Sequence, residues 1–177
     1  MNRHEETGTI SVDEALDSDR HAARAVVDID EPVTKLVIFR LQDQLFAFPG
    51  SSIREIISRQ AEVFPLPGMH PSVEGVMNLR GEIQSVLQLD SLLQLPANGT
   101  ETKGGILLGE GAGMRTGIRI DELLDVTDII QSQLRPPMEG LPAQLQPVVS
   151  AMLEYNGLPV TLLDMDLLLQ AWQQACQ

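Results

Sequence analysis

The segment Gly109-Glu110-Gly111-Ala112-Gly113 is the part of this sequence that comes nearest to a nucleotide-binding motif. It follows an apolar run, as a phosphate loop would, but it lacks the lysine of a Walker motif and the full dinucleotide spacing. Residues 114–120 then have the pattern of a strand, so no helix N-terminus follows to stabilise a phosphate. Glu110 would also repel one. We therefore interpret the segment as a hairpin turn.

Other groups capable of chemistry are few and poorly spaced. The only cysteine is Cys176, and the three histidines are His4, His21 and His70. None of these lies at metal-ligand spacing from another, and there is no Gly-x-Ser-x-Gly nucleophile elbow. Asp164 and Asp166 lie at the start of an expected C-terminal helix, where capping explains them better than an acid pair does. The sequence therefore predicts a protein that is not an enzyme and needs no metal or cofactor.

Charge and composition limit the class of partner. The chain has 177 residues, of which 43% are hydrophobic, and a formal net charge of -13. Such an acidic chain repels phosphate backbones and anionic lipids, so we expect neither nucleic-acid binding nor direct membrane insertion. The N-terminus has no apolar stretch of the kind found in secretory signals, and the one cysteine cannot form an internal disulfide. We therefore expect a cytoplasmic protein.

Two regions of different character divide the chain. Residues 1–33 contain nine acidic side chains and three arginines, a net charge of -6, with no aromatic residue and no sustained apolar period. This composition predicts a disordered acidic tail. Residues 34–177 alternate apolar runs with turn signals and form the expected ordered domain.

Four pairs of short apolar runs predict β-hairpins. The paired runs are 36–41 with 45–48, 76–79 with 83–87, 105–108 with 114–120, and 148–155 with 158–163. The last pair is joined by Asn156-Gly157, a specific signal because both positions tolerate positive φ. Several hairpins with few helices indicate small antiparallel barrels. Four phenylalanines are expected in their core: Phe39, Phe46, Phe48 and Phe64.

Helical signals are short. Ser52 and Glu55 have capping-box spacing, which predicts a short helix over 52–57. Asp90, Asp121 and Asp164 each follow an apolar run and precede leucines, and each is expected to cap a helical turn. The chain ends in an amphipathic helix whose one face is expected to pack on a barrel through Trp172. That face comprises Met165, Leu168, Leu169, Trp172 and Cys176.

The run Gly75-Val76-Met77-Asn78-Leu79-Arg80-Gly81-Glu82-Ile83 resembles the signature of CheW-like domains. Other segments are similar to the family in the same order, and the resemblance covers residues 34 to about 172. These segments are 53–56, 65–67, 116–123, 135–137 and 162–164. Three positions depart from the family pattern: Gln88 stands where Asp is usual, Asp90 where Arg is common, and Arg119 where an aliphatic residue is usual.

The resemblance implies a mostly β fold of two intertwined five-stranded SH3-like barrels, with short helices and a C-terminal amphipathic helix. We expect the barrels roughly over 34–98 and 99–164. It further implies a non-catalytic adaptor that couples the regulatory domain of a CheA-like histidine kinase to the cytoplasmic tip of a chemoreceptor, within receptor arrays at the membrane. An adaptor of pilus motility or of another chemosensory pathway, or a generic protein-binding barrel, stays an alternative.

Eight residues are candidates for partner binding: Ile53, Glu55, Gly75, Asn78, Arg80, Gly81, Ile118 and Ile120. Most also have a structural interpretation. The isoleucines suit a core, Glu55 suits a helix cap, and the glycines suit backbone positions that exclude a side chain. Arg80 is costly to bury unpaired, so we expect it to be exposed or bonded to backbone carbonyls. A direct contact and a structural anchor are both open for Arg80.

Overall fold

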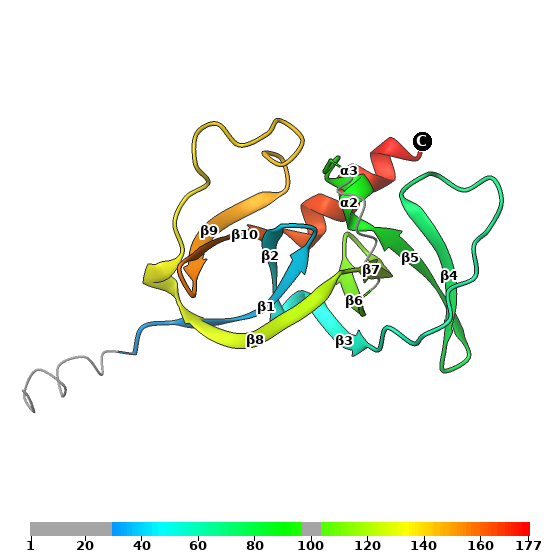
Figure 1. The fold of residues 1–177 in the computed structure, drawn as a ribbon, viewed down its shortest axis with the longest axis horizontal. Coiled ribbons are helices and arrows are strands. Elements are labelled where there is room, and N and C mark those ends of the chain that lie inside the picture. The colour runs from blue at the N-terminus through cyan, green and yellow to red at the C-terminus, as the bar shows by residue number, and fades with distance from the viewer. Residues whose placement is uncertain (1–29, 97–103) are drawn as a thin grey trace, which may run out of the picture. The chain divides into compact units, whose positions relative to one another are not determined.

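Two five-stranded sheets make up most of the described chain, which in this computed structural model comprises residues 30–96 and 104–177. The first sheet, in spatial order, contains β8 (Glu122–Ile130), β1 (Val33–Leu41), β2 (Gln44–Pro49), β10 (Leu158–Leu163) and β9 (Val149–Tyr155) (Figure 1). The second contains β3 (Ile53–Ile57), β6 (Ile106–Gly111), β7 (Met114–Arg119), β5 (Glu82–Gln88) and β4 (Val73–Leu79). We call them barrel 1 and barrel 2. The mostly β fold is confirmed, and nearly all of the predicted acidic tail lies outside the described residues.

The barrels do not divide the chain near residue 98, as the sequence suggested. Barrel 2 uses the continuous segment 53–119, whereas barrel 1 joins strands from both ends of the described domain. The reason is the parallel pairing of β2 with β10, which sets Leu45 opposite Val160 and Ala47 opposite Leu162. A hairpin from each end of the domain is thus needed to complete barrel 1.

The two barrels repeat one topology. Each contains two antiparallel hairpins joined by a parallel strand pair, β2 with β10 in barrel 1 and β5 with β7 in barrel 2. The segment after an edge strand then bridges to the opposite edge: Phe64 pairs with Val76 on β4, and Arg135 pairs with Met152 on β9. These bridges satisfy backbone groups that an open sheet edge would leave free.

All four predicted hairpins are present. Three of them turn through a dipeptide in which both residues have positive φ: 80–81 (53° and 89°), 112–113 (49° and 73°) and 156–157 (51° and 78°). This is the type I′ geometry, which matches the right-handed twist of paired strands. Glycine is the second residue of each pair, and only at 156–157 is the first residue asparagine.

Two predicted helical segments are absent, and a third is present but is not capped as predicted. Residues 53–57 form β3, preceded by the 3₁₀ turn η1 (Gly50–Ser52), because pairing with β6 overrides the capping-box spacing. Asp121 precedes β8, a strand that we did not predict, and its carboxylate accepts from the backbone N–H of Gln42. Asp90 lies inside α2 (Leu89–Leu92), whose N-cap is Gln88, which makes no side-chain cap. A second 3₁₀ turn, η2 (Gln131–Gln133), follows β8.

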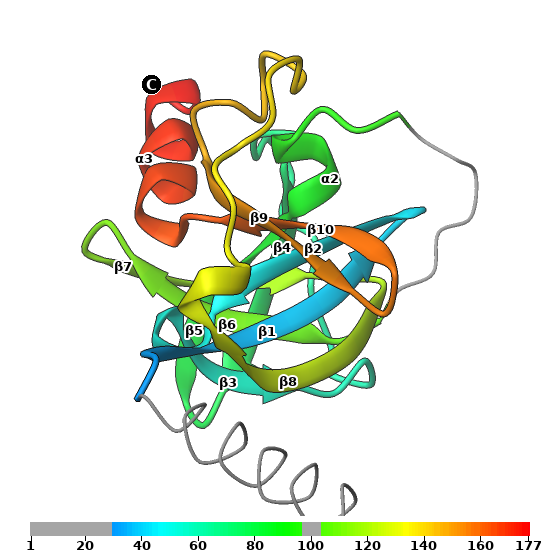
Figure 2. The same cartoon turned by 90° about the vertical axis from the view of Figure 1, so that its left-hand side faces the viewer.

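The predicted C-terminal helix is present as α3 (Met165–Ala175), but Cys176, assigned to its packed face, is the exposed C-cap residue. Asp164 caps the start of α3 by accepting a hydrogen bond from the backbone N–H of Leu167 at 2.9 Å. The inner face of α3 packs into a core cluster that contains residues of both barrels. Its buried residues there are Met165, Leu168 and Leu169. Trp172 is half-buried and its Nε1–H donates to Ser72 Oγ at 3.0 Å. Figure 2 shows α3 alongside β9 and β10.

The aromatic core is smaller than predicted. Phe39, Phe46 and Phe48 are fully buried, with the Phe39 ring 6.2 Å from Phe46 and 5.4 Å from Phe48, centroid to centroid. Phe64 is 54% exposed, so its assignment to the core is wrong. Its backbone bridges β4, and this fixes its main chain while leaving the ring at the surface.

No helix of the described residues is long and apolar enough to cross a bilayer.

Candidate partner-binding surface

Glu55 and Arg80 meet on the surface of barrel 2. Arg80 Nη2 donates to Glu55 Oε1 at 2.9 Å, although 25 residues separate them. Glu55 lies on β3 and Arg80 in the β4–β5 turn, at opposite edges of the sheet order, so closure of the barrel brings them together. The Arg80 side chain is 78% accessible and that of Glu55 is 30% accessible. An ion pair so exposed adds little stability and leaves guanidinium donors facing solvent.

The turn that carries Arg80 is braced by Asn78. Asn78 Oδ1 accepts a hydrogen bond from the backbone N–H of Gly81 at 2.8 Å. Gly81 has a φ of 89°, which glycine adopts without strain, whereas Arg80 has a φ of 53°. Asn78 therefore acts within the turn, and Arg80 is the exposed group that the turn presents. Of the two expectations for Arg80, exposure is the one that the structure has. Its guanidinium pairs with Glu55 and not with backbone carbonyls.

Three other candidates serve the fold. A Cβ at Gly75 would lie 2.2 Å from the carbonyl oxygen of Phe64, so the bridge between Phe64 and β4 requires glycine there. Ile118 and Ile120 are completely buried in the main core cluster. A side chain without exposed surface has nothing to offer a partner, so the assignment of these two isoleucines to partner binding is wrong and their core interpretation holds.

Four large apolar side chains on β3 and β8 are exposed. Ile53 is half-buried against the core, but Ile56 of β3 is 43% exposed. Leu123, Val126 and Ile130 of β8 are 38%, 43% and 37% exposed. We call these four side chains the apolar stripe, namely Ile56, Leu123, Val126 and Ile130. We missed the three on β8 because the strand itself was missed, although its run of β-branched residues is a strand signal.

A ladder of charges crosses the outer surface of barrel 2. Arg54 Nε lies 2.6 Å from Glu110 Oε2, Arg115 lies 3.7 Å from the same oxygen, and Arg115 lies 3.8 Å from Glu82. The order of these residues follows the strand order β3-β6-β7-β5. The hydrogen bond from Arg54, with its charge, lowers the pKa of the Glu110 carboxyl. Glu110 is thus paired with two neighbouring arginines, Arg54 and Arg115.

The glycines around Glu110 accommodate α3. A Cβ at Gly109 would lie 2.5 Å from Met165 Cε, and one at Gly111 would lie 3.0 Å from Asp166 Oδ1. Asp166 Oδ1 also accepts from the backbone N–H of Ala112 at 2.6 Å. The 109–113 segment is therefore the tip of the β6–β7 hairpin packed under a helix start, in agreement with our interpretation of it as a turn.

A buried ion pair that the sequence did not reveal joins β4 to β7. Arg119 Nε and Nη2 each lie 2.8 Å from an oxygen of Glu74, and Nη1 donates to the carbonyl of Gly104 at 3.1 Å. Both side chains are about nine-tenths buried, at 10% and 9% accessible. Glu74 lies where the β4–β5 register shifts between Val73 and Gly75, and such a bulge re-aims a side chain. Arg119, which stands where the family usually has an aliphatic residue, is thus paired with Glu74 inside the fold.

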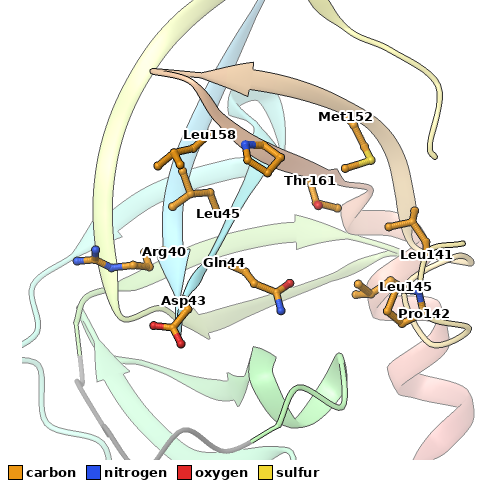
Figure 3. Close-up of a pocket in the computed structure, with 11 residues that line it drawn as sticks. Arg40, Asp43, Gln44, Leu45, Leu141, Pro142, Leu145, Met152, Leu158 and Thr161 are labelled. Carbon is orange, nitrogen blue, oxygen red and sulfur yellow. The ribbon is translucent and has the colours of Figure 1, made fainter. Parts of the chain in front are cut away.

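A separate groove of about 500 Å³ lies on barrel 1 (Figure 3). Leu45 and Leu158 line its strand side, and Leu141 and Leu145 line the side formed by the loop before β9. Arg40 lies at its rim, paired with Glu122. Its walls are mostly apolar, and Asp43, Gln44 and Thr161 add polar groups. None of the eight candidates from the sequence lines it.

Comparison with known proteins gives this surface its context. Residues 35–173 match the family model of the CheW-like domain, and the chain belongs to that family. It is 28% identical over 121 residues to the chemotaxis protein CheW of Treponema pallidum, covering 66% of this chain and 71% of that protein. It is 29% identical over 100 residues to CheW of Thermotoga maritima, covering 56% and 65%.

Two further similarities extend this context. Protein PilI of Pseudomonas aeruginosa is 27% identical over 115 residues, covering 63% of this chain and 62% of PilI. Among solved structures, the scaffolding protein TtCheW of Thermoanaerobacter tengcongensis superposes with a TM-score of 0.68 at 20% identity, covering 77% of this chain and 92% of that one. At that identity, the likeness concerns the fold, which is the CheW-type pair of SH3-like barrels.

Proposed function

We propose that this chain is a non-catalytic adaptor that couples a CheA-like histidine kinase, through its regulatory domain, to the cytoplasmic tip of a chemoreceptor. The observation that carries the proposal is the exposed Glu55–Arg80 pair, presented by the hairpin with the family signature. Arginine is enriched among the residues that dominate binding energy at interfaces. A side chain 78% accessible has little other purpose within the fold.

An adaptor needs two surfaces, and the described residues offer two of different chemistry. One is polar and centred on Glu55 and Arg80; the other is the apolar stripe on β3 and β8. Large exposed apolar patches mark interaction sites in soluble proteins, and we propose that these four side chains contribute to one. Two partners bound at once on one adaptor gain affinity through effective concentration. In this proposal the protein works in the cytoplasm, at receptor arrays to which its partners recruit it.

A second candidate pathway rests on the similarity to PilI. Identity to PilI is 27%, against 28% and 29% to two CheW proteins, so sequence similarity does not separate the pathways. The alternative role is the same coupling function in pilus motility, with a different receptor. Pull-down with cytoplasmic fragments of each receptor from the same organism separates the two, because only the cognate receptor is retained.

The test of the adaptor role is formation of a ternary complex. The purified chain is mixed with the regulatory domain of the CheA-like kinase from the same organism and with a cytoplasmic receptor fragment, and complexes are measured by calorimetry and gel filtration. We expect each partner to bind alone and both to bind together. Val126→Asp in the apolar stripe should weaken one partner and Arg80→Ala the other, whereas Arg59→Ala, at another exposed arginine, should weaken neither. Failure of the wild-type chain to bind either partner would refute the proposal.

A further inference from the structure

Three hairpins of this chain use the same turn geometry with different first residues. Asn156, Ala112 and Arg80 have φ values of 51°, 49° and 53°, and each precedes a glycine. Asparagine suits this left-handed conformation because its short polar side chain can bond locally to the backbone. Arginine has no such compensation. The chain thus uses a well-suited residue at one turn and a poorly suited one in the turn with the family signature.

Arg80 recovers little of this cost within the fold. Its side chain is 78% accessible, and its one ion pair, to Glu55, lies at the surface where solvent screens it. It therefore gains nothing from burial. Left-handed backbone in a residue other than glycine persists only where the surroundings enforce it, and such residues cluster at functional sites.

Asn78 holds the Arg80–Gly81 turn in this left-handed conformation. Its Oδ1 accepts from the backbone N–H of Gly81 at 2.8 Å, which ties the strand end to the second residue of the turn. Asn78 is exposed, so it makes no contribution to the core. Its hydrogen bond fixes the turn in the conformation from which Arg80 reaches Glu55, 2.9 Å away.

We propose that Asn78 is a positioning residue for Arg80, and that the chain gives up folding stability at Arg80 in return for partner binding. This inference rests on the proposed adaptor function. Folding stability and partner affinity usually fall together in a variant. Here a substitution at position 80 that relieves the backbone strain of the turn should make the protein more stable and the complex weaker.

The first experiment compares Arg80→Asn with Gln42→Asn. Gln42 is the matched control because it also begins a hairpin turn, with a φ of 55°, and lies outside the surface proposed for binding. Both variants should melt higher, by about 2–4 °C for a chain of this size. The affinity of the partner that binds the Glu55–Arg80 surface, whether the CheA-like regulatory domain or the receptor fragment, should fall at least about thirtyfold for Arg80→Asn. It should stay at the wild-type value for Gln42→Asn.

The second experiment tests Asn78 with a double-mutant cycle. Asn78→Ala should weaken binding of that same partner in the wild-type background and have no effect in the Arg80→Asn background. Asn78→Asp keeps an acceptor for Gly81 N–H and should restore most of the affinity. A purely structural role would give the same loss in both backgrounds, and that result would overturn the assignment of Asn78.

The outcomes also distinguish this inference from the function beneath it. If the wild-type chain binds both partners and Arg80→Asn binds both equally well, the inference is overturned while the adaptor function stands. A lower melting temperature for Arg80→Asn would likewise overturn the claim that Arg80 is kept at a cost to stability. If the wild-type chain fails to bind, both proposals fall together.

Discussion

Arg119 and Glu74 form a two-pronged ion pair inside barrel 2, with both nitrogen–oxygen distances at 2.8 Å. Neither charge reaches solvent to a useful degree, since the side chains are 10% and 9% accessible. Removing Arg119 would take this two-pronged ion pair away from a buried carboxylate, which is among the most costly single changes in a protein.

We therefore expect Arg119→Leu to lower the free energy of unfolding by about 3–5 kcal/mol, measured by urea denaturation. The double variant Glu74→Leu with Arg119→Leu should recover most of that loss, because no buried charge is left alone. Lys35→Ala is the control, since Lys35 pairs with Asp128 at 2.9 Å at the surface. It should cost under about 1 kcal/mol. Equal losses for Arg119→Leu and Lys35→Ala would show that the inner pair is not buried in solution.

The phenol of Tyr155 makes a hydrogen bond between the two edge strands of barrel 1. Its O–H donates to Asp125 Oδ2 at 2.8 Å, between the two edge strands β9 and β8. The hydrogen bond to the Asp125 carboxylate raises the pKa of Tyr155, with desolvation and the negative charge acting in the same direction. The neutral phenol is thus the form that the fold favours, so this tie stabilises the protein below the ordinary tyrosine pKa of about 10 and is lost as pH rises.

Tyr155 is the only tyrosine, so its ionisation can be followed by ultraviolet absorbance without ambiguity. We expect the titration midpoint of the folded protein to lie above that of the unfolded chain. Asp125→Ala should move the midpoint back toward the ordinary value. Identical midpoints for the wild-type chain and the variant would mean that the hydrogen bond is not formed in solution.

Glu110 should show the opposite shift. Its hydrogen bond with Arg54, together with the positive charge, lowers the pKa of the Glu110 carboxyl. Because the folded pKa lies below the unfolded one, the pair stabilises the protein above the ordinary glutamate value of about 4.3 and is lost as pH falls through the folded value. Carbon-detected NMR titration should place the pKa of Glu110 below the ordinary glutamate value, and Arg54→Ala should raise it. No change in that variant would contradict the ladder.

The hairpins could be predicted from sequence because their signals are local. Asn156-Gly157 and the glycines at 81 and 113 specify turns within a few residues of the strands that they join. Residues 53–57 show the limit of such reasoning: the capping-box spacing of Ser52 and Glu55 is also local, but pairing with β6, about 50 residues later, decided the conformation. The parallel pairing of β2 with β10 is equally remote, and so the division into barrels was placed wrongly.

The site was predictable in part for the same reason. The family signature indicated Arg80, and its exposure agrees with one of the two expectations for it. Its partner Glu55 was chosen as a candidate, but their contact depends on closure of barrel 2 and has no trace in their spacing. Ile118 and Ile120 fit an apolar surface or a core equally well in sequence, and burial alone decides between them.

The most direct test of the claim that Arg80 is the centre of a partner-binding surface is the affinity of Arg80→Ala for the regulatory domain of the CheA-like kinase and for the receptor fragment, measured by calorimetry beside a melting curve. Because the side chain is 78% accessible and its ion pair is at the surface, the melting temperature should change little. The account predicts that one affinity falls by about 2 kcal/mol or more, roughly thirtyfold, while the other is kept. Unchanged melting with both affinities at the wild-type value would contradict it.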